Sequence, residues 1–504
     1  MLRRTIGGIK KEQLSENRLS GDDFKIAFRY FPIYTAKVRE WFITAHGVPL
    51  QMWHERSDWQ KRIAPMVSAI LSSWTLFFGL ALIMIGNGLQ LVLLGLRTSD
   101  AGFSTFVSGL VMGAYFLGLF LGSLGVPRFL SAVGHVRVFG ALAAIASAAV
   151  LLYVIVVDPV IWGLTRLMSG FAYAGMYIVV ESWLNDSASN KTRGQLLSLY
   201  LIITMAGMGL GQLLAGLDDG QSSTLFLLSS VAVSIAVVPI LITVAKAPDF
   251  TVTESTSLRR LIQISPLAFV GMACQGLTAS MMFGMGAIYA KGLGMSAGQV
   301  SLFMTSVTIG TLLLQYPVGR LSDIFDRRVV ILVVTTLSGL LAMCGIFFSA
   351  GQYNVLMIIM GLYGGMSLTL YSLCIAHAND YLSPSQMVGT ASALIMVNGA
   401  GSVLGSPLVA FAMDMVGDIG YFSSLAIVHF MLSAFALVRM ATSEATPVEA
   451  QGPFVAVPEM GTAEAVTLNP EVAWTETDED IEETDPLADN PYLPQGLGRP
   501  DSTP

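Results

Sequence analysis

Charged residues are scarce in this chain: they make up 12% of its 504 residues, about half the share usual in soluble proteins. Apolar residues make up 54%, and a water-soluble surface cannot be built from such a composition. The only three cysteines, Cys274, Cys344 and Cys374, fall inside apolar stretches, which argues against disulfides and a metal cluster. The sequence contains no Walker loop and no residues spaced as a catalytic triad. We therefore expect no enzyme activity, no catalytic residue, no cofactor and no metal site.

Long apolar stretches dominate what is present. About twelve lie between Ala64 and Met440, and each can cross a hydrocarbon core of about 30 Å, which takes roughly 20 helical residues. We expect the spans near residues 66–95, 102–126, 136–157, 160–183, 195–216, 223–245, 265–290, 298–318, 329–350, 353–376, 386–412 and 419–440. The sequence therefore predicts an all-α integral membrane protein with twelve transmembrane helices.

The last six spans repeat the first six at an offset of about 195 residues, which predicts two pseudo-symmetric six-helix bundles. We expect a basic cytoplasmic extension at 1–63, a first bundle at 64–245, a linker at 246–264, a second bundle at 265–441 and an acidic tail at 442–504. The extension either forms amphipathic helices on an anionic membrane surface or does not belong to the natural product. The tail is rich in Pro, Thr, Glu and Asp and is expected to be disordered. Neither end is expected to carry the chemistry.

Basic residues gather in the loops on one side of the predicted bundles. They are Arg128, Arg137, Lys191, Arg193, Lys246, Arg259, Arg260, Arg320, Arg327 and Arg328. The opposite loops hold only Arg97 and Lys291. Because loops rich in Lys and Arg remain in the cytoplasm, we expect both termini there.

A short loop recurs in both halves of the chain. After the eighth span the sequence reads Tyr316-Pro-Val-Gly319-Arg320-Leu-Ser-Asp323-Ile-Phe-Asp326-Arg327-Arg328, and after the second it reads Gly122-Ser-Leu-Gly-Val126-Pro-Arg128. The later copy resembles the Gly-x-Leu-Ala/Ser-Asp-x-x-Gly/Asp-Arg-Arg/Lys loop signature of the major facilitator superfamily, and the resemblance covers nearly all of residues 64–441. It implies the two-bundle fold of that family.

The resemblance also implies a cytoplasmic gate. Asp323 is expected to lie against the amino end of a neighbouring helix, while Arg327 and Arg328 pair with acids across the bundle. The two arginines are alternatively no more than positive-inside anchors. Val126 stands where the first half should have its acid, so that half of the gate is expected to be weakened or built differently. The remaining gate residues that we expect are Arg128, Arg137, Asp186 and Asp380.

A second repeated block follows the fourth and tenth spans. Glu181-Ser-Trp-Leu-Asn185-Asp186 corresponds to His377-Ala-Asn379-Asp380. Together with Leu-Ile-Met-Ile-Gly-Asn87-Gly-Leu-Gln90 in the first span, this block resembles the YcaD-type branch of the superfamily, whose substrates the resemblance does not define. We expect a multi-pass protein of the bacterial plasma (inner) membrane.

The fourth span carries the strongest polar signal. At 100° per residue, Trp162, Arg166, Tyr173, Tyr177 and Glu181 fall within an arc of about 100°. Burying such groups costs several kcal/mol unless they face water or a partner, so we expect this stripe to face a central cavity.

Two charges in this stripe have more than one interpretation. Arg166 with Gly170 resembles the Arg-x-x-x-Gly element of proton-coupled members, where the arginine acts in proton coupling or on substrate charge. Alternatively, carbonyls or helix-end dipoles satisfy it. Glu181 is about 22 Å from Arg166 along the helix, too far to pair. We expect it to pair with Arg128 or Arg137 as a gate acid, with a proton carrier as the alternative.

Polar residues on other spans complete the candidate site. Asn87, Gln90 and Asn398 lie at depths where each needs a partner inside the protein. We expect them to contact the substrate; alternatively, they hold helices together by hydrogen bonds.

These observations predict a secondary active transporter of a small organic solute, working by alternating access. We expect proton coupling, leave the direction undecided, and weigh an anionic or zwitterionic cargo against an apolar drug. The expected partners are this substrate, protons or another ion, and the lipid bilayer; we expect no nucleic acid and a monomer. The alternative is a non-transporting sensor or membrane scaffold of the same fold, which docks a cytoplasmic partner.

Overall fold

The computed structural model describes residues 73–188, 192–217, 223–242, 256–348, 351–443, 446–459 and 461–469. Within these ranges there are twelve long helices: α3 (Trp74–Asp100), α4 (Thr105–Val133), α5 (His135–Ile155), α6 (Pro159–Ser187), α7 (Arg193–Leu214), α8 (Thr224–Leu241), α10 (Pro266–Gly292), α11 (Ala297–Ile324), α12 (Arg327–Gly345), α13 (Tyr353–Asn379), α14 (Pro384–Val416) and α15 (Ile419–Thr442). The shorter elements are η2 (Ala215–Leu217), α9 (Leu258–Ile264), η3 (Val448–Ala450) and α16 (Ala463–Val466). The predicted all-α fold is confirmed, while the extension 1–63 lies outside the described residues.

Eleven of the long helices in the described ranges are long and apolar enough to cross a membrane. The twelfth, α6, has 29 residues but falls short in apolar character. It is the helix with the predicted polar stripe, which explains the difference: α6 faces other helices instead of lipid along much of its surface.

The predicted spans agree with most helix ends to within four residues. The clearest exceptions are α4, which ends at Val133 instead of 126, and α11, which ends at Ile324 instead of 318. The ends of α3 and α12, at Asp100 and Gly345, differ from the expected 95 and 350 by five residues each. Pro127 lies inside α4, and Leu130 beyond it is still buried. The helix therefore continues past a proline because tertiary packing of its last turns outweighs the lost hydrogen bond.

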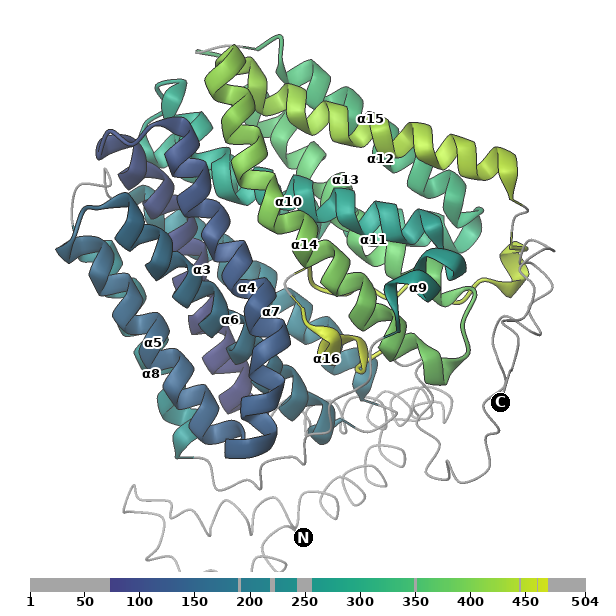
Figure 1. Cartoon of the computed structure of the whole chain (residues 1–504), viewed down its shortest axis with the longest axis horizontal. Helices are drawn as coiled ribbons and strands as arrows, with labels where there is room; N and C mark the ends of the chain where they lie inside the picture. The colour runs from purple at the N-terminus through teal and green to yellow at the C-terminus, as the bar shows by residue number, and fades with distance from the viewer. Residues whose placement is uncertain are drawn as a thin grey trace, which may run out of the picture. The chain divides into compact units, whose positions relative to one another are not determined.

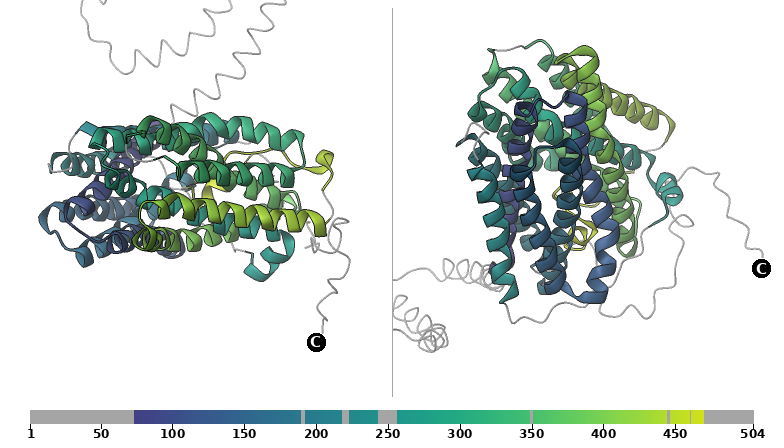
Figure 2. Two further views of the ribbon diagram at one scale, coloured as in Figure 1. Left: turned by 90° about the horizontal axis from the view of Figure 1, so that it is seen from above. Right: turned by 60° about the vertical axis from the view of Figure 1, so that its left-hand side comes forward.

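The helices pack as two bundles (Figures 1 and 2). In the first, α4 packs against α6 and α3 against α7; the corresponding pairs of the second bundle are α11 with α13 and α10 with α14. Between the bundles, α4 lies against α14, α7 against α11 and α3 against α10.

Glycines permit the closest helix pairs in both bundles. A Cβ added to Gly211 of α7 would overlap the main-chain carbonyl oxygen of Ile85 in α3. A Cβ added to Gly405 of α14 would overlap the carbonyl oxygen of Leu277 in α10. These backbone contacts require glycine and repeat the same close packing in the two halves.

The molecule has two distinguishable ends, which we call the basic side and the opposite side. The basic side holds the carboxyl ends of α4, α6, α11 and α13 and the amino ends of α5, α7, α12 and α14. On the opposite side the bundles are bonded directly. Lys291 Nζ lies 3.2 Å from Asp100 Oδ1, and the Phe106 main-chain N–H donates to Asp414 Oδ2 at 3.2 Å.

The chain beyond α15 differs from the expectation of a disordered tail. Residues 446–459 and 461–469, here called the C-terminal segment, run between the bundles on the basic side, where the yellow ribbon of α16 lies in Figure 1. Val457, Ala465, Val466 and Leu468 are buried. Composition alone did not reveal this, because the segment packs on other helices instead of forming a core of its own.

Candidate functional site

The five stripe residues of α6 are all buried. Trp162, Arg166, Tyr173 and Glu181 are 0% exposed and Tyr177 is 2% exposed. α6 begins cleanly because Asp158 accepts hydrogen bonds from the main-chain N–H groups of its first turn and a proline occupies the first helical position. The burial of all five side chains shows that this face of α6 points into the protein.

Asn87 and Gln90 of α3 form hydrogen bonds with the two tyrosines in the middle of this stripe. Asn87 Nδ2 donates to the Tyr177 hydroxyl at 3.0 Å, and its Oδ1 accepts from Tyr115 at 3.0 Å. Gln90 Nε2 lies 2.9 Å from the hydroxyl of Tyr173 and donates to it. The structure thus brings these predicted site residues together as hydrogen-bonding contacts between α3, α4 and α6.

Arg166 is a buried cation with few polar partners. Its guanidinium carbon lies 4.5 Å from the ring centroid of Tyr115, and Nη2 lies 3.8 Å from Met112 Sδ. Among the described residues, Nε and Nη1 have no hydrogen-bond partner. In the described part of the chain Nη2 contacts Met112 and not a carbonyl oxygen, while the alternative of helix-end dipoles stays a prediction.

A cavity of about 370 Å³ lies between the bundles. Its residues come from α4, α6, α10 and α14 and from the C-terminal segment, and include Phe120, Arg128, Tyr177, Phe283, Asn398, Ser402, Glu459, Thr462 and Glu464. Asn398 donates to the Met272 carbonyl oxygen at 3.3 Å and to the Gln275 side chain. Tyr177 and Asn398 thus place polar groups from opposite bundles on one mostly apolar wall, the usual composition of a small-molecule pocket.

The partners of Glu181 differ from the prediction. Its carboxylate accepts hydrogen bonds from the Tyr200 hydroxyl, from the Thr462 hydroxyl and from the Thr462 main-chain N–H at 3.0 and 3.2 Å. The expected pairing with Arg128 or Arg137 is therefore wrong in this conformation. Both arginines are exposed, whereas the C-terminal segment supplies donors directly at the buried carboxylate.

Arg327 lies at the centre of the residues that were predicted to form a gate in the second bundle. It forms an ion pair with Asp380, and both side chains are 1% exposed. It also donates to Ser322 Oγ at 2.8 Å and to the Ala376 carbonyl oxygen at 2.9 Å. These bonds join α11, α12 and α13 at the basic side.

Asp323 was expected to cap a neighbouring helix, but it does not. Its Oδ1 accepts from the Phe454 main-chain N–H at 2.7 Å and lies 4.0 Å from Arg327. Asp326 is the capping acid of α12, because it accepts from the Arg328 main-chain N–H at 2.9 Å and also pairs with the Arg328 side chain. Asp326 directly precedes α12, so its carboxylate reaches the unpaired N–H groups of the first turn.

At the corresponding described positions of the first bundle, Val126 and Asp186, the arrangement is different. Val126 is fully buried, and its side chain packs at Gly175 of α6, while Asp186 is exposed at the end of that helix. An apolar side chain at this position seals the contact between α4 and α6 instead of forming a polar gate.

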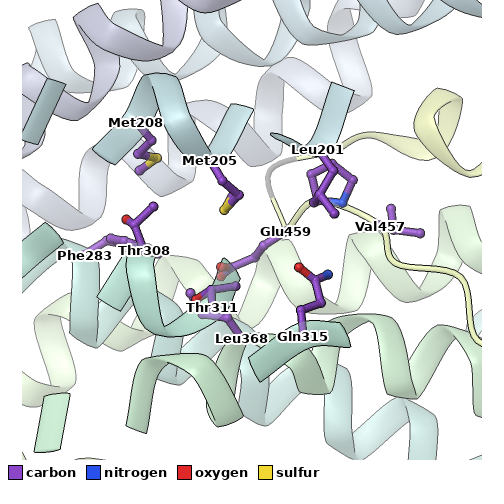
Figure 3. A pocket seen from close by; sticks show the side chains of 11 residues that line it. Leu201, Met205, Met208, Phe283, Thr308, Thr311, Gln315, Leu368, Val457 and Glu459 are labelled. Carbon is purple, nitrogen blue, oxygen red and sulfur yellow. The ribbon is translucent and has the colours of Figure 1, made fainter. Parts of the chain in front are cut away.

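Sequence reasoning missed Glu459. Figure 3 shows its side chain between Met205 of α7 and Thr311 of α11. Burial raises the pKa of its carboxyl to about 8, and the Gln275 side chain opposes this shift. The sequence offered one signal for its burial: the acid directly follows Val457 and Pro458 in a tail that was expected to be disordered.

Comparison with known proteins identifies the fold family. The sequence profile of the Major Facilitator Superfamily matches residues 76–262 and 267–476. This chain belongs to the major facilitator superfamily. It is therefore a multi-pass membrane protein of a transporter family and not an enzyme.

Individual superfamily members agree with this placement. The chain is 26% identical to an uncharacterized MFS-type transporter, YcaD, of Salmonella arizonae over 375 residues, which cover 74% of this chain and 97% of that protein. YcaD of Salmonella typhimurium is also 26% identical, over 377 residues, with the same coverage. The predicted resemblance is confirmed.

Solved structures share the fold of this superfamily. A variant of the nucleoside transporter NupG matches with a TM-score of 0.62 and 14% identity, over 73% of this chain and 99% of that one. A bacterial homolog of the human lysosomal transporter Spinster, in an inward-facing and occupied conformation, matches with a TM-score of 0.61 and 14% identity, over 77% and 99%.

Proposed function

We propose that this chain is a secondary active transporter that moves a small organic solute across the bacterial inner membrane by alternating access. The basic side would face the cytoplasm, as the excess of Lys and Arg in its loops supports. We propose that it acts as a monomer.

One observation carries the proposal: the cavity lies between two bundles that are joined on the opposite side. Asp100 with Lys291 and Phe106 with Asp414 join the bundles there. Rocking about a site at the bundle interface is how transporters built from repeats expose it to one side at a time.

Arg166 and Glu181 are our candidates for substrate charge and proton coupling. Arg166 places an incompletely hydrogen-bonded cation inside the first bundle, which favours an anionic or zwitterionic solute. Glu181 lies nearer the basic side, where the hydrogen-bonding partners of its carboxylate among the described residues, Tyr200 and Thr462, are neutral. A carboxyl in such a setting exchanges its proton when the partners move away.

A thermal-shift screen of the purified chain tests for the binding site. The panel contains nucleosides, sugars, amino acids, organic anions and cationic drugs, and the variants are Asn398→Ala and Arg166→Met, with the exposed Arg320→Gln as control. We expect a compound to stabilise the unchanged chain and the control, because binding to the folded state raises its stability. It should stabilise neither Asn398→Ala, which alters the cavity wall, nor Arg166→Met, which removes the buried cation of the first bundle. Equal shifts in all four proteins would refute this site.

Proton coupling is tested with the compound so found in proteoliposomes. Uptake by the unchanged chain should accelerate when a pH gradient is imposed, whereas Glu181→Gln or Arg166→Lys should remove that acceleration. Glu449→Gln, on the exposed part of the C-terminal segment, is the control. Retention of the gradient dependence in both site variants would contradict the coupling assignment.

A non-transporting sensor or scaffold is the second candidate. The C-terminal segment favours it, because a peptide of the chain itself forms part of the cavity wall between the bundles. Binding of panel compounds without uptake in any proteoliposome would support this alternative.

A further inference from the structure

The C-terminal segment is bonded first to the second bundle. The Gly452 carbonyl oxygen accepts from Arg327 Nη2 at 2.7 Å, and its N–H donates to Asp380 Oδ1 at 3.2 Å. Farther along, the Ser372 hydroxyl lies 3.0 Å from the main-chain nitrogen of Val457 and 3.1 Å from its carbonyl oxygen. The segment therefore uses the ion pair at the centre of the gate.

The same segment is then bonded to the first bundle. Glu181 accepts from Thr462, as described above. Asn185 Nδ2 donates to the Glu464 carbonyl oxygen at 2.6 Å, and Arg193 Nη1 donates to the Thr467 carbonyl oxygen at 2.9 Å. The stretch from Gly452 to Thr467 thus connects α12 and α13 with α6 and α7 across the basic side.

The shape of the contact is as specific as its hydrogen bonds. The ring of Phe454 lies against Gly319 of α11 so closely that an added Cβ would overlap it. Val466 and Leu468 are 0% exposed, and Glu459 together with residues 461–464 forms part of the cavity wall. The segment fills space between the bundles instead of lying on their surface.

We propose that the C-terminal segment is an intramolecular plug that must leave the space between the bundles before the protein can complete a transport cycle. This inference rests on the proposed alternating access, in which the basic sides of the two bundles must approach each other. A chain segment bonded to both bundles prevents that approach. It also covers the end of the cavity through which a solute would pass to the basic side.

The short connection between α15 and the C-terminal segment makes such a plug effective. Ser443, at the end of α15, is itself held by Arg328, whose Nη1 donates to its carbonyl oxygen at 2.9 Å. The segment begins three residues later, so its effective concentration at the cavity is on the order of millimolar or higher. Weak individual hydrogen bonds are then sufficient to keep it seated, and it can still be displaced.

The first test measures whether the segment is seated in solution. With Cys274, Cys344 and Cys374 replaced by alanine, a single cysteine is introduced as Ala465→Cys, which is buried, or as Glu449→Cys, which is exposed in the same segment. We expect a polar maleimide to modify the first at least about tenfold more slowly than the second, because modification must wait for local opening. Equal rates would overturn the plug, while the transporter proposal would stand.

The second test measures whether the seated segment blocks closure. Spin labels at Ala132→Cys and Ser385→Cys report the separation of α4 and α14 at the basic side, where both positions are exposed. The full chain is compared with a deletion of 446–504 and with a matched deletion of 471–504 that retains the segment. We expect a second, shorter distance in the 446–504 deletion only.

Each other outcome counts against a different proposal. Two distances already present in the full chain would overturn the plug while supporting alternating access. A single distance in all three proteins would overturn alternating access, and the plug would fall with it.

Discussion

Acidification is expected to seat the C-terminal segment more firmly, chiefly through Glu459. Burial raises the pKa of its carboxyl to about 8 from an ordinary 4.5, with Gln275 opposing the shift. The titratable or charged groups near it are the hydroxyl of Tyr371, together with Arg128 and Glu464 on the wall of the same cavity.

The direction of this pH effect depends on whether the seated or the released segment binds the proton of Glu459 more tightly. In the seated segment the carboxyl holds its proton up to about pH 8, whereas in the released segment it returns to water and its ordinary pKa. The contribution to seating is therefore complete below about pH 4.5 and is lost as the pH rises through about 8. Between pH 8 and pH 6 the ratio of seated to released segment should rise on the order of fifty-fold from this group. Burial also raises the pKa of Glu464, to about 7, which adds in the same direction.

The assay is the modification rate of Ala465→Cys divided by that of Glu449→Cys at each pH. The division removes the intrinsic pH dependence of thiol reactivity, because both cysteines lie in the same segment. We expect the ratio to fall as the pH is lowered from 8 to 6. Glu459→Gln keeps the shape of the side chain but cannot titrate, so it should flatten the curve and leave the smaller effects of Glu464 and of Glu181, which accepts from Thr462 of the segment. The reasoning is refuted if the glutamine variant follows the same curve as the unchanged segment.

Three further substitutions test the packing and the buried charges. Arg327→Met should lower the free energy of unfolding by about 3–5 kcal/mol in chemical denaturation, because it leaves a buried carboxylate without its base, whereas the exposed Arg320→Gln should not. Gly276→Val should abolish the folded peak in size-exclusion chromatography, since an added Cβ would overlap a carbonyl oxygen of α14, while Gly163→Ala, with open space around it, should elute unchanged. Arg166→Met should keep or raise the melting temperature because two guanidinium nitrogens are unpaired; a fall as large as that of Arg327→Met would make Arg166 a structural cation.

The twelve helices could be predicted because the length of an apolar stretch is a property of composition alone. The inward position of the α6 stripe followed from the same physics, since Arg166 and Glu181 cannot face lipid. The late end of α4 could not be predicted in this way. Pro127 is a local signal to stop, and only packing around Leu130 overrides it.

The hydrogen-bonding partners of the buried acids were harder to predict than the positions of these acids in the helices. Glu181 and Asp323 were each assigned a partner within the bundles, but both accept hydrogen bonds from the C-terminal segment. Main-chain N–H groups supply these bonds at Thr462 and Phe454, and every residue except proline carries such a group. A pattern of side chains therefore cannot predict this kind of contact. For the same reason, a polar tail without long apolar runs is predicted to be disordered.

Recognition of the C-terminal segment mainly through its backbone has a consequence for inhibitor design. Gly452, Val457, Gly461 and Glu464 are all held by main-chain atoms, so these four hydrogen bonds do not depend on which side chains they carry. A short macrocyclic peptide that presents the same donors and acceptors, with apolar groups at the buried positions of Phe454, Val466 and Leu468, would fit this surface. Such a ligand would immobilise the two halves from a single face, and its side chains would remain available for tuning solubility and membrane permeation.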